Sequence, residues 1–239
     1  MPMRKPAGRA VTSGNRATGF LTARRSKRIL IVCEGKQTEP NYFQTMIRVH
    51  KLNEVTLADS RSLSIDVKGA ARSTLSLTEY ALSLQTNGKE RYEEIWCVFD
   101  KDDFMPDAFD NAVGRALNHE FLRVAWSNEA FELWFVLHFQ YLDTAALIGG
   151  GNPRDYYRHR LDQLMRSDGL GVYKKNDPEM YTRLGTKRRM AADKNARRLL
   201  QSHPAGKPCH QCIPATTIHL LVEHLLSYEP EIPRSPQTK

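Results

Sequence analysis

Four acidic residues follow two apolar segments of the chain, at the positions where buried strands would end. The segments are ILIVC (residues 29–33) and EIWCVF (residues 94–99). The acids are Glu34, Asp100, Asp102 and Asp103. Ligands of open α/β sheets bind at the carboxyl ends of the strands, so these acids meet at one rim if the two strands are neighbours.

The types and spacing of these acids suit a hard divalent cation. Residues i and i+2 of an extended chain point to the same side, so Asp100 and Asp102 can face one cation together. Mg²⁺ (or Mn²⁺) held by carboxylates keeps coordination positions for a phosphate. Such a metal activates water and stabilises the leaving oxygen in phosphodiester cleavage. A single acid at a strand end is more simply a solvated residue, whereas Glu-Gly after one strand and Asp-x-Asp after another together favour a metal site.

An alternation of strands and helices is predicted around these acids. Residues 29–33 form a continuous apolar run, typical of a strand covered on both faces, and residues 94–99 are again apolar. Further strands are predicted at residues 63–67 and 121–126. Helices are predicted between them at residues 40–50, capped by Thr38, and at residues 73–85 and 107–118. Strands separated by helices of this length indicate an α/β domain with a parallel sheet flanked by helices, over residues 28–128.

The remainder of the chain, residues 129–228, is predicted to form a C-terminal helical extension that packs on this domain. Its helices are expected at residues 129–139, 155–166, 186–202 and 215–226. The last residues, 229–239, are rich in proline and are expected to form a flexible tail.

The composition is that of a globular protein that spans no membrane. Of the 239 residues, 41% are hydrophobic and 9% are aromatic. The longest apolar run, residues 130–139, is shorter than the roughly 18 to 20 residues of a membrane span and is interrupted by Glu132 and His138. No apolar signal segment opens the chain, so we expect a cytoplasmic protein without membrane contact.

The formal charge of +8 originates at the start of the chain. Residues 1–28 contain eight Lys and Arg and no acid, and the rest of the chain has 27 basic and 27 acidic residues. We expect residues 1–27 to form a disordered basic arm, which either adds salt-dependent affinity for a polyanion or is merely solvated. Within the body, basic residues concentrate between Arg154 and Arg198, the better candidate for a phosphate-contacting surface.

Three residues near the predicted rim are candidates for supporting roles. Gly35 lets the chain turn away from the sheet while its backbone stays near a phosphate. Glu39 either completes the metal shell or only starts a helix, where negative charge is favourable. Asn128 either caps the helix that follows or reaches the acidic rim, and capping is the favoured interpretation.

The segment SNEAFELWFVLHF contains Glu132 and His138 in a helix that is apolar almost all round and therefore largely buried. A buried carboxylate needs a cation, a hydrogen-bond donor or a proton. Glu132 is thus either a further metal ligand or general base, or the structural partner of a buried Arg or backbone amide. His138 is predicted to be a satisfied core histidine.

Basic residues in the C-terminal half can contact phosphate. Lys174 and Lys175 are candidates for binding the scissile phosphate or its developing charge, with a solvated loop as the alternative. A second basic set forms either a nucleic-acid-binding surface or the solvated side of a helix, and the latter is slightly favoured. Its members are Arg183, Lys187, Arg188 and Arg189.

A CxxC at Cys209 and Cys212 can form part of a zinc site. The histidines near it are His203, His210 and His219. A single CxxC without a second pair is weak evidence, and the sequence leaves zinc binding open.

The first two motifs, VCEGKQTE and VFDKDD, resemble the Toprim domain shared by topoisomerases, primases and OLD-type nucleases, in which a strand-end Glu-Gly and a DxD bind the divalent metal. An ordered series of motifs is more narrowly similar to the RloB family, whose relatives include AbiL-type phage-resistance proteins. The series is EGKQTEPNYF, VFDKDDF, SNEAFELWFVLHF, YKKN and PATTIHLLVEHLL, and the likeness extends over residues 28–227.

The resemblance implies a Toprim-like nuclease that cleaves RNA or DNA as the toxic effector of an anti-phage abortive-infection system, usually beside an ABC-type ATPase. It places the metal on Glu34, Asp100 and Asp102, with Asp103 as a spare. Glu132 and Lys175 complete the expected catalytic set. The helical extension and the basic arm depart from the simplest Toprim pattern, so the substrate rules of topoisomerases do not transfer. The alternative is a non-catalytic subunit that binds nucleic acid or the ATPase, and a homo-oligomer stays open.

Overall fold

The computed structural model describes residues 26–87, 91–102, 105–147 and 151–229. The predictions for the basic arm before residue 26, for the tail after residue 229 and for Asp103 lie outside the described residues. Among the described residues, no helix combines the length and the apolar content needed to cross a membrane.

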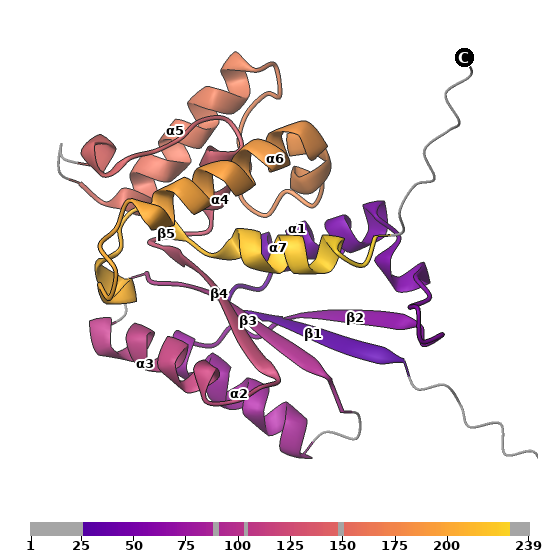
Figure 1. The fold of residues 1–239 in the computed structure, drawn as a ribbon. Coiled ribbons are helices and arrows are strands. Elements are labelled where there is room, and N and C mark those ends of the chain that lie inside the picture. Colours follow the sequence, from indigo (N-terminus) through magenta and orange to yellow (C-terminus); the bar gives the residue numbers. More distant parts are fainter. Residues whose placement is uncertain (1–25, 88–90, 103–104, 148–150, 230–239) are drawn as a thin grey trace, which may run out of the picture.

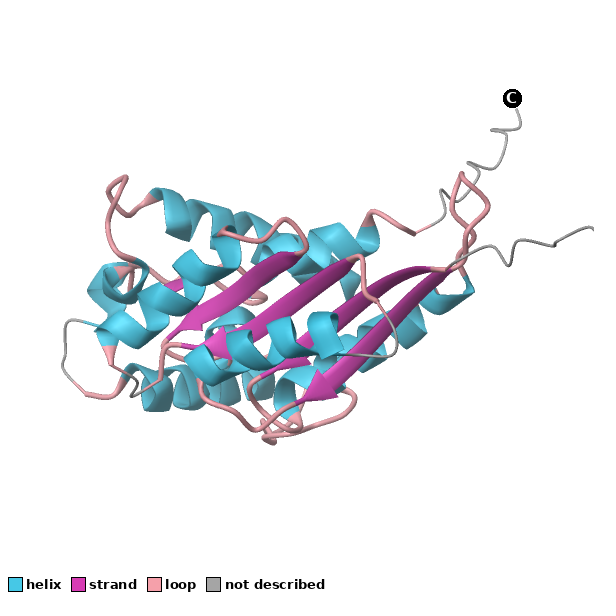
Figure 2. Cartoon of the chain, turned by 90° about the horizontal axis from the view of Figure 1, so that it is seen from below, coloured by secondary structure: helices cyan, strands magenta, loops and turns pink. Residues whose placement is uncertain are grey.

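A five-stranded sheet with the order β2-β1-β3-β4-β5 forms the centre of the molecule. The strands are β1 (Lys27–Cys33), β2 (Leu63–Gly69), β3 (Glu94–Asp100), β4 (Leu122–Asn128) and β5 (Ala215–Thr216). The first four are parallel, and β5 runs antiparallel to β4. Figure 2 shows the parallel strands side by side with their arrowheads at one end. The predicted α/β class is confirmed, and β1 is indeed the neighbour of β3.

Helices cover both faces of the sheet, as the continuous apolar strands require (Figure 1). One face carries α2 (Thr74–Asn87) and α3 (Pro106–Leu117), which pack with Leu30 and Val32 of β1. On the other face, Ile29 and Ile31 meet the remaining helices. These are α1 (Thr38–Val49), α4 (Glu132–Leu137), α5 (Pro153–Ser167), α6 (Met180–Gln201) and α7 (Ile218–Leu226). Short 3-10 turns lie at Leu52–Glu54, Thr144–Leu147 and Cys209–Gln211.

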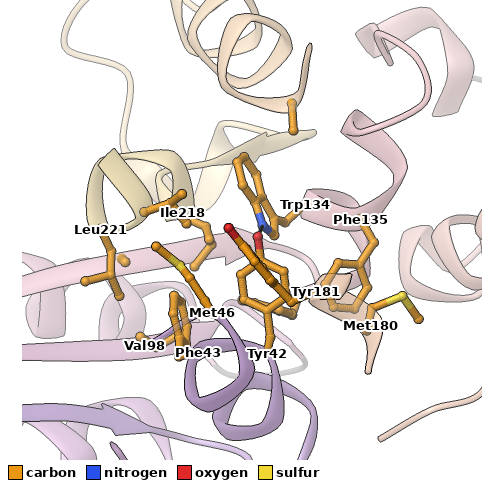
Figure 3. Packing of buried hydrophobic residues seen from close by; sticks show 14 of the residues in the cluster. Tyr42, Phe43, Met46, Val98, Trp134, Phe135, Met180, Tyr181, Ile218 and Leu221 are labelled. Atoms are coloured by element: carbon orange, nitrogen blue, oxygen red, sulfur yellow. Dashed lines mark hydrogen bonds between the residues drawn. The ribbon is translucent and has the colours of Figure 1, made fainter. Parts of the chain in front are cut away.

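The first helix and the C-terminal helices share one hydrophobic core. Tyr42 of α1 packs edge-on against Tyr181 of α6, with their ring centroids 5.2 Å apart, and accepts a 2.9 Å hydrogen bond from the indole of Trp134 in α4 (Figure 3). Trp134 is fully buried, as are the other apolar residues of α4, which confirms the predicted burial of this helix. Residues 129–228 therefore complete the core of the α/β domain.

The structure differs from the predicted elements in two informative places. The region expected to be purely helical contributes β5, which pairs with Ser127 and Asn128 at the end of β4. This strand has only two residues, too short for any periodicity to reveal it. Helix α6 begins at Met180 rather than residue 186, because two helical segments join at Gly185, whose φ of 72° interrupts the pattern.

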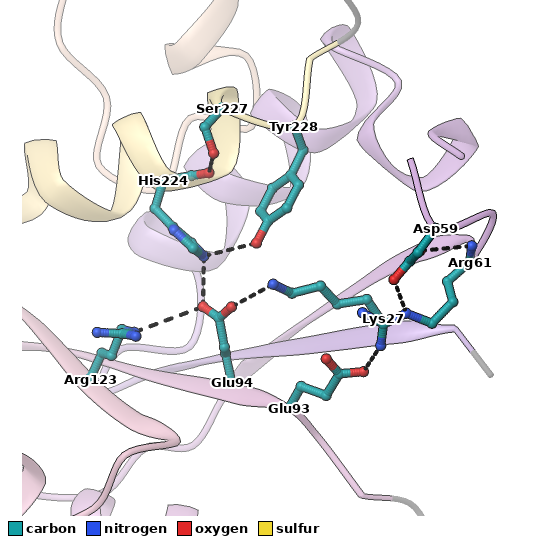
Figure 4. Close-up of polar contacts among 9 residues, drawn as sticks. All are labelled: Lys27, Asp59, Arg61, Glu93, Glu94, Arg123, His224, Ser227 and Tyr228. Atoms are coloured by element: carbon teal, nitrogen blue, oxygen red, sulfur yellow. Dashed lines mark hydrogen bonds and ion pairs between the residues drawn. The ribbon is translucent and has the colours of Figure 1, made fainter. Parts of the chain in front are cut away.

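A polar cluster closes the end of the sheet opposite the acids (Figure 4). Glu94 lies 2.8 Å from the ammonium of Lys27 in β1, 2.6 Å from His224 in α7 and 3.8 Å from Arg123 in β4. Burial opposes ionisation of Glu94, but the contacts with His224 and Lys27 outweigh it and lower its pKa to about 2. The cluster thus ties the start of β1 to the end of α7.

Replacement of this carboxylate should destabilise the fold in a pH-dependent way. Glu94→Gln should lower the free energy of unfolding by about 2 kcal/mol at pH 7, because an amide cannot pair with the surrounding cations. The folded pKa of Glu94 lies below the ordinary value of 4.5, so its ionised form stabilises the fold above that value. The difference between wild type and variant in urea unfolding should therefore shrink as the pH falls from about 5 to about 2.

The neighbouring Glu93→Gln provides a matched control. Glu93 pairs with Arg61 at the surface and its side chain is 45% exposed, so its replacement should cost less than about 0.5 kcal/mol. Equal losses for the two variants would contradict the role assigned to the Glu94 cluster.

Candidate functional site

A cavity of about 160 Å³ lies at the carboxyl ends of β1 and β3. Five carboxylates and three cationic side chains line it, together with Gly35, Thr38 and Phe131. The carboxylates belong to Glu34, Glu39, Asp100, Asp102 and Glu132. The cations are Arg154, Arg158 and Lys175. The cavity thus gathers the predicted rim acids with residues from four helical and loop segments that are distant in sequence.

Backbone amides fix the two acids at the strand ends. The amide of Glu34 donates to the carbonyl of Val98, which continues the pairing of β1 with β3 by one residue. The Glu34 carboxylate accepts a 3.3 Å hydrogen bond from the amide of Asp100, and the Asp100 carboxylate accepts a 3.0 Å bond from the amide of Phe131. The prediction that these two acids meet at one rim is confirmed.

Asp102 reaches the cavity by a different backbone geometry from the one expected. Its φ of 46° is left-handed, so the chain from Asp100 to Asp102 is not extended and the expected i, i+2 geometry is wrong. Its amide donates to the Glu129 carbonyl and its own carbonyl accepts from Lys101. The carboxylate forms an ion pair with Arg154. Asp103, the expected spare ligand, lies outside the described residues.

Gly35 makes room for the carboxylate of Glu39. A Cβ added to residue 35 would lie 3.0 Å from Cδ of Glu39 and closer still to one of its oxygens. The φ of Gly35 is not positive, so its backbone conformation does not require a glycine, and the expected role in turning the chain is not the reason for a glycine here. Glu39 lies in the first turn of α1 and is also buried against the cavity, while its place in a metal shell stays a prediction.

Glu132, at the start of α4, is the partner of an arginine, one of the two alternatives left open by the sequence, and its role as metal ligand or general base stays a prediction. It lines the cavity, and its side chain is only 4% exposed. One carboxylate oxygen accepts a 2.9 Å hydrogen bond from Arg158 and a 3.2 Å bond from the Tyr173 hydroxyl. Glu132 is therefore the ion-pair partner of an arginine, and this ion pair lies in the cavity.

The loop that carries Lys175 is fastened to α1. Thr38 donates to the side chain of Asn176 at 2.8 Å, Asn41 donates to the Asn176 carbonyl at 2.8 Å, and Thr45 donates to the Pro178 carbonyl at 2.7 Å. The expected capping of α1 by Thr38 is wrong, because Thr38 is already helical and its hydroxyl serves this loop. Lys175 lines the cavity, whereas Lys174 lines an adjoining groove of about 620 Å³.

Burial and crowding make ionisation of the acids costly. Burial raises the pKa of Glu34 to about 7, with the charge of Glu39 adding to the effect and Arg154 opposing it. Burial and the neighbouring carboxylates also raise the pKa values of Asp100 and Glu39, the latter opposed by Lys175. A site of this kind gains free energy from any further cation that enters it.

The donor set fits a hard divalent cation in chemistry, since it offers only carboxylate oxygens. Within the described part of the chain, no three His, Cys, Asp or Glu side chains are grouped so that they could hold a metal ion as they stand. Two of the acids are engaged by arginines instead: Asp102 faces Arg154 and Glu132 faces Arg158. A metal would have to exchange with these guanidinium groups.

Arg154 and Arg158 were not singled out from the sequence as cavity residues. The available signal was their i, i+4 spacing in PRDYYR, which puts both on one face of α5. The predicted basic set of α6 is largely engaged within the fold: Arg183 pairs with Asp177, Arg188 with Asp168 and Arg189 with Asp193. Lys187 is exposed. Nucleic-acid binding by this set stays a prediction.

Asn128 has neither of the roles considered for it. Its amide nitrogen donates to the carbonyls of Cys209, His210 and Cys212, and it is not among the residues that line the cavity. It therefore fastens the CxxC loop to β4. Helix α4 begins after Phe131 without a side-chain cap.

Two of the three histidines near the CxxC have other partners. His210 contacts Asp110 at 2.7 Å and His203 contacts the Pro214 carbonyl at 2.9 Å. Burial raises the pKa of both Cys209 and Cys212. His138 is a buried core residue, as predicted: it contacts the Trp134 carbonyl at 2.8 Å, and burial lowers its pKa to about 3.

The contact between Gly35 and Glu39 can be tested by a double-mutant cycle. Gly35→Ala should lower the free energy of unfolding by about 1–3 kcal/mol, the usual cost of overpacking. In a Glu39→Ala background the same change should cost less than about 0.5 kcal/mol, because the atoms that the new methyl group meets are gone. Urea unfolding of the four proteins measures the coupling. Additive losses would show that the methyl group meets something other than Glu39.

The comparison with known families gives one match. The family model described as RloB-like protein matches residues 29–225, a span that runs from β1 to α7 and includes every residue lining the cavity. No match was found among curated proteins or among solved structures. The chain belongs to the RloB-like protein family.

Proposed function

We propose that the protein is a metal-dependent nuclease of Toprim type that cleaves RNA or DNA phosphodiesters. The observation that carries the proposal is the meeting of Glu34, Asp100 and Asp102 in one cavity at the carboxyl ends of adjacent parallel strands. Glu34, Asp100 and Asp102 would hold the ion, Mg²⁺ or Mn²⁺. When bound, such an ion activates water and stabilises the leaving oxygen.

The other cavity residues have roles that follow from their charge and anchorage. Lys175 is the cation of the loop that α1 holds in place, and it is suited to bind the phosphate and stabilise its developing charge. Glu132 is held by Arg158 and Tyr173, so its carboxylate is fixed in position to accept a proton from an attacking water.

Membership of the RloB-like family supports a role in an anti-phage system. We propose that the nuclease is the toxic effector of abortive infection and that it works in the cytoplasm with an ABC-type ATPase. A toxic enzyme needs a restraint, and in this scheme the ATPase supplies it until infection.

The nuclease proposal predicts metal-dependent cleavage that requires the strand-end acids. Full-length protein incubated with tRNA, single-stranded DNA and duplex DNA should cleave at least one of them with Mg²⁺ or Mn²⁺ and none after chelation. Glu34→Gln and Asp100→Asn should each lower the rate by about 100-fold or more, since loss of outer-shell partners alone typically costs 10–100-fold. Glu79→Gln, an exposed acid of α2 paired with Arg115, is the matched control and should cleave as the parent does.

Two outcomes would decide against the proposal. Undiminished cleavage by both Glu34→Gln and Asp100→Asn would show that the acids are not the site. If the parent is inactive in isolation, the same variants are expressed with the neighbouring ATPase, and phage defence is measured. Defence that survives Asp100→Asn would exclude catalysis at this site.

A non-catalytic binding subunit is the second candidate. The ion pairs of Asp102 and Glu132 with α5 favour it, since they leave no finished metal site in the described residues. In that case the cavity would be a structural core of charges, and the outer surface of the helices would bind nucleic acid or the ATPase. Defence would then depend on exposed residues such as Lys187 and survive loss of the acids.

A further inference from the structure

Helix α5 inserts two arginines into the acidic cavity. Arg154 lies in the first turn of the helix and Arg158 one turn later, so both project from the same face. Each guanidinium takes one acid: Arg154 pairs with Asp102, and Arg158 pairs with Glu132. Both arginines line the cavity, so they are part of the surface that any ligand would meet.

The two ion pairs differ in burial and anchorage. Glu132 is 4% exposed and its oxygen is held by both Arg158 and Tyr173, which makes this pair a fixed part of the cavity wall. The Arg154 and Asp102 side chains are 22% and 32% exposed. Arg158 is itself 33% exposed, so the two pairs differ in their acids: Asp102 is open to water, whereas Glu132 is buried. Arg154 is therefore the exchangeable cation of the site.

The backbone of Arg154 is held by the cap of α5 and by the packing of this helix. Its amide donates to the side chain of Asn152, the cap of α5, at 2.9 Å. Helix α5 packs against α4, and its residues Tyr157, Leu161 and Met165 are fully buried. A guanidinium mounted in this way can leave Asp102 without leaving the cavity.

The charge of the cavity determines what happens when Arg154 is displaced. Five carboxylates and three cations line the cavity, so the acids, to the extent that they are ionised, repel a polyanionic substrate until a cation compensates them. If Asp102 held a divalent cation, this repulsion would be reduced and Arg154 would be released from its ion pair. A planar guanidinium binds a phosphate through two parallel hydrogen bonds, which makes a phosphodiester its best new partner.

We propose that Arg154 is a built-in counter-ion of Asp102 that competes with the divalent cation and, once displaced, binds the phosphate of the substrate. The inference rests on the proposed nuclease function and adds to it a phosphate-binding residue and a defined order of events. Metal occupies the acids first, and nucleic acid binds afterwards. Arg158 stays on Glu132 throughout.

The proposal predicts opposite effects of one substitution on two affinities. In calorimetric titrations of the full-length protein, Arg154→Gln should bind Mn²⁺ about ten-fold more tightly than wild type, since the competing charge is gone. In the presence of Ca²⁺, the same variant should bind a short phosphorothioate RNA or DNA oligonucleotide about ten-fold more weakly. Arg154→Lys, which keeps the charge but not the planar fork, should restore Mn²⁺ affinity to near the wild-type value and oligonucleotide affinity only in part.

Arg160→Gln is the matched control. Arg160 lies on the same helix, carries the same charge and contacts Gln140 and Gln163 outside the cavity, so its loss should leave both affinities unchanged. A purely structural role of Arg154 would weaken both affinities together with thermal stability. Weaker or unchanged Mn²⁺ binding by Arg154→Gln would overturn the proposal.

The experiment separates this inference from the nuclease proposal. If Asp100→Asn binds Mn²⁺ as tightly as wild type, the metal site itself is wrong and the proposed function fails with it. If Asp100→Asn loses Mn²⁺ binding while Arg154→Gln changes neither affinity, the metal site stands and the counter-ion role of Arg154 fails alone.

Discussion

Repulsion among carboxylates is the constraint on which the rest of this structure depends. The parallel pairing of β1 with β3 brings Glu34 beside Asp100, and the chain then adds Asp102, Glu39 and Glu132 to the same small cavity. Burial of like charges is unfavourable unless cations or protons accompany them. The cations come from α5 and from the loop before α6, and for this reason the α/β sheet and the C-terminal helices cannot be considered separately.

Helix α1 links the apolar core to this charged cavity. Its buried face, with Tyr42, packs against α4 and α6, while its hydroxyl and amide side chains hold the loop that presents Lys175. Its first turn delivers Glu39 into the space that Gly35 leaves open. In the motif EGKQTEPNYF, Glu34 and Glu39 thus line the cavity, whereas Thr38 and Asn41 hold the loop opposite.

The two ends of the sheet show how environment decides the behaviour of one residue type. At the amino end, the contacts of Glu94 with His224 and Lys27 outweigh burial and lower its pKa to about 2. At the carboxyl end, burial near Glu39 raises the pKa of Glu34 to about 7. At neutral pH, ionised Glu94 stabilises the fold, whereas ionisation of Glu34 destabilises it. A carboxylate whose ionisation is unfavourable, at the rim where ligands of such sheets bind, is typical of a functional site.

The sequence by itself determined the strands, their parallel arrangement and the two acids that end β1 and β3, because continuous apolar runs and the residues that end them are local properties. It also indicated the burial of α4 and of His138. Only the tertiary structure decided which groups from distant parts of the chain contact the acids of the cavity. Four sets of contacts join segments that lie far apart along the chain. They are the ion pairs of Arg154 with Asp102 and of Arg158 with Glu132, the hydrogen bonds of Asn176 to α1, those of Asn128 to the CxxC loop, and the pairing of β5 with β4. No local pattern records such contacts, since they arise only when packing of the core fixes how the helices lie on the sheet.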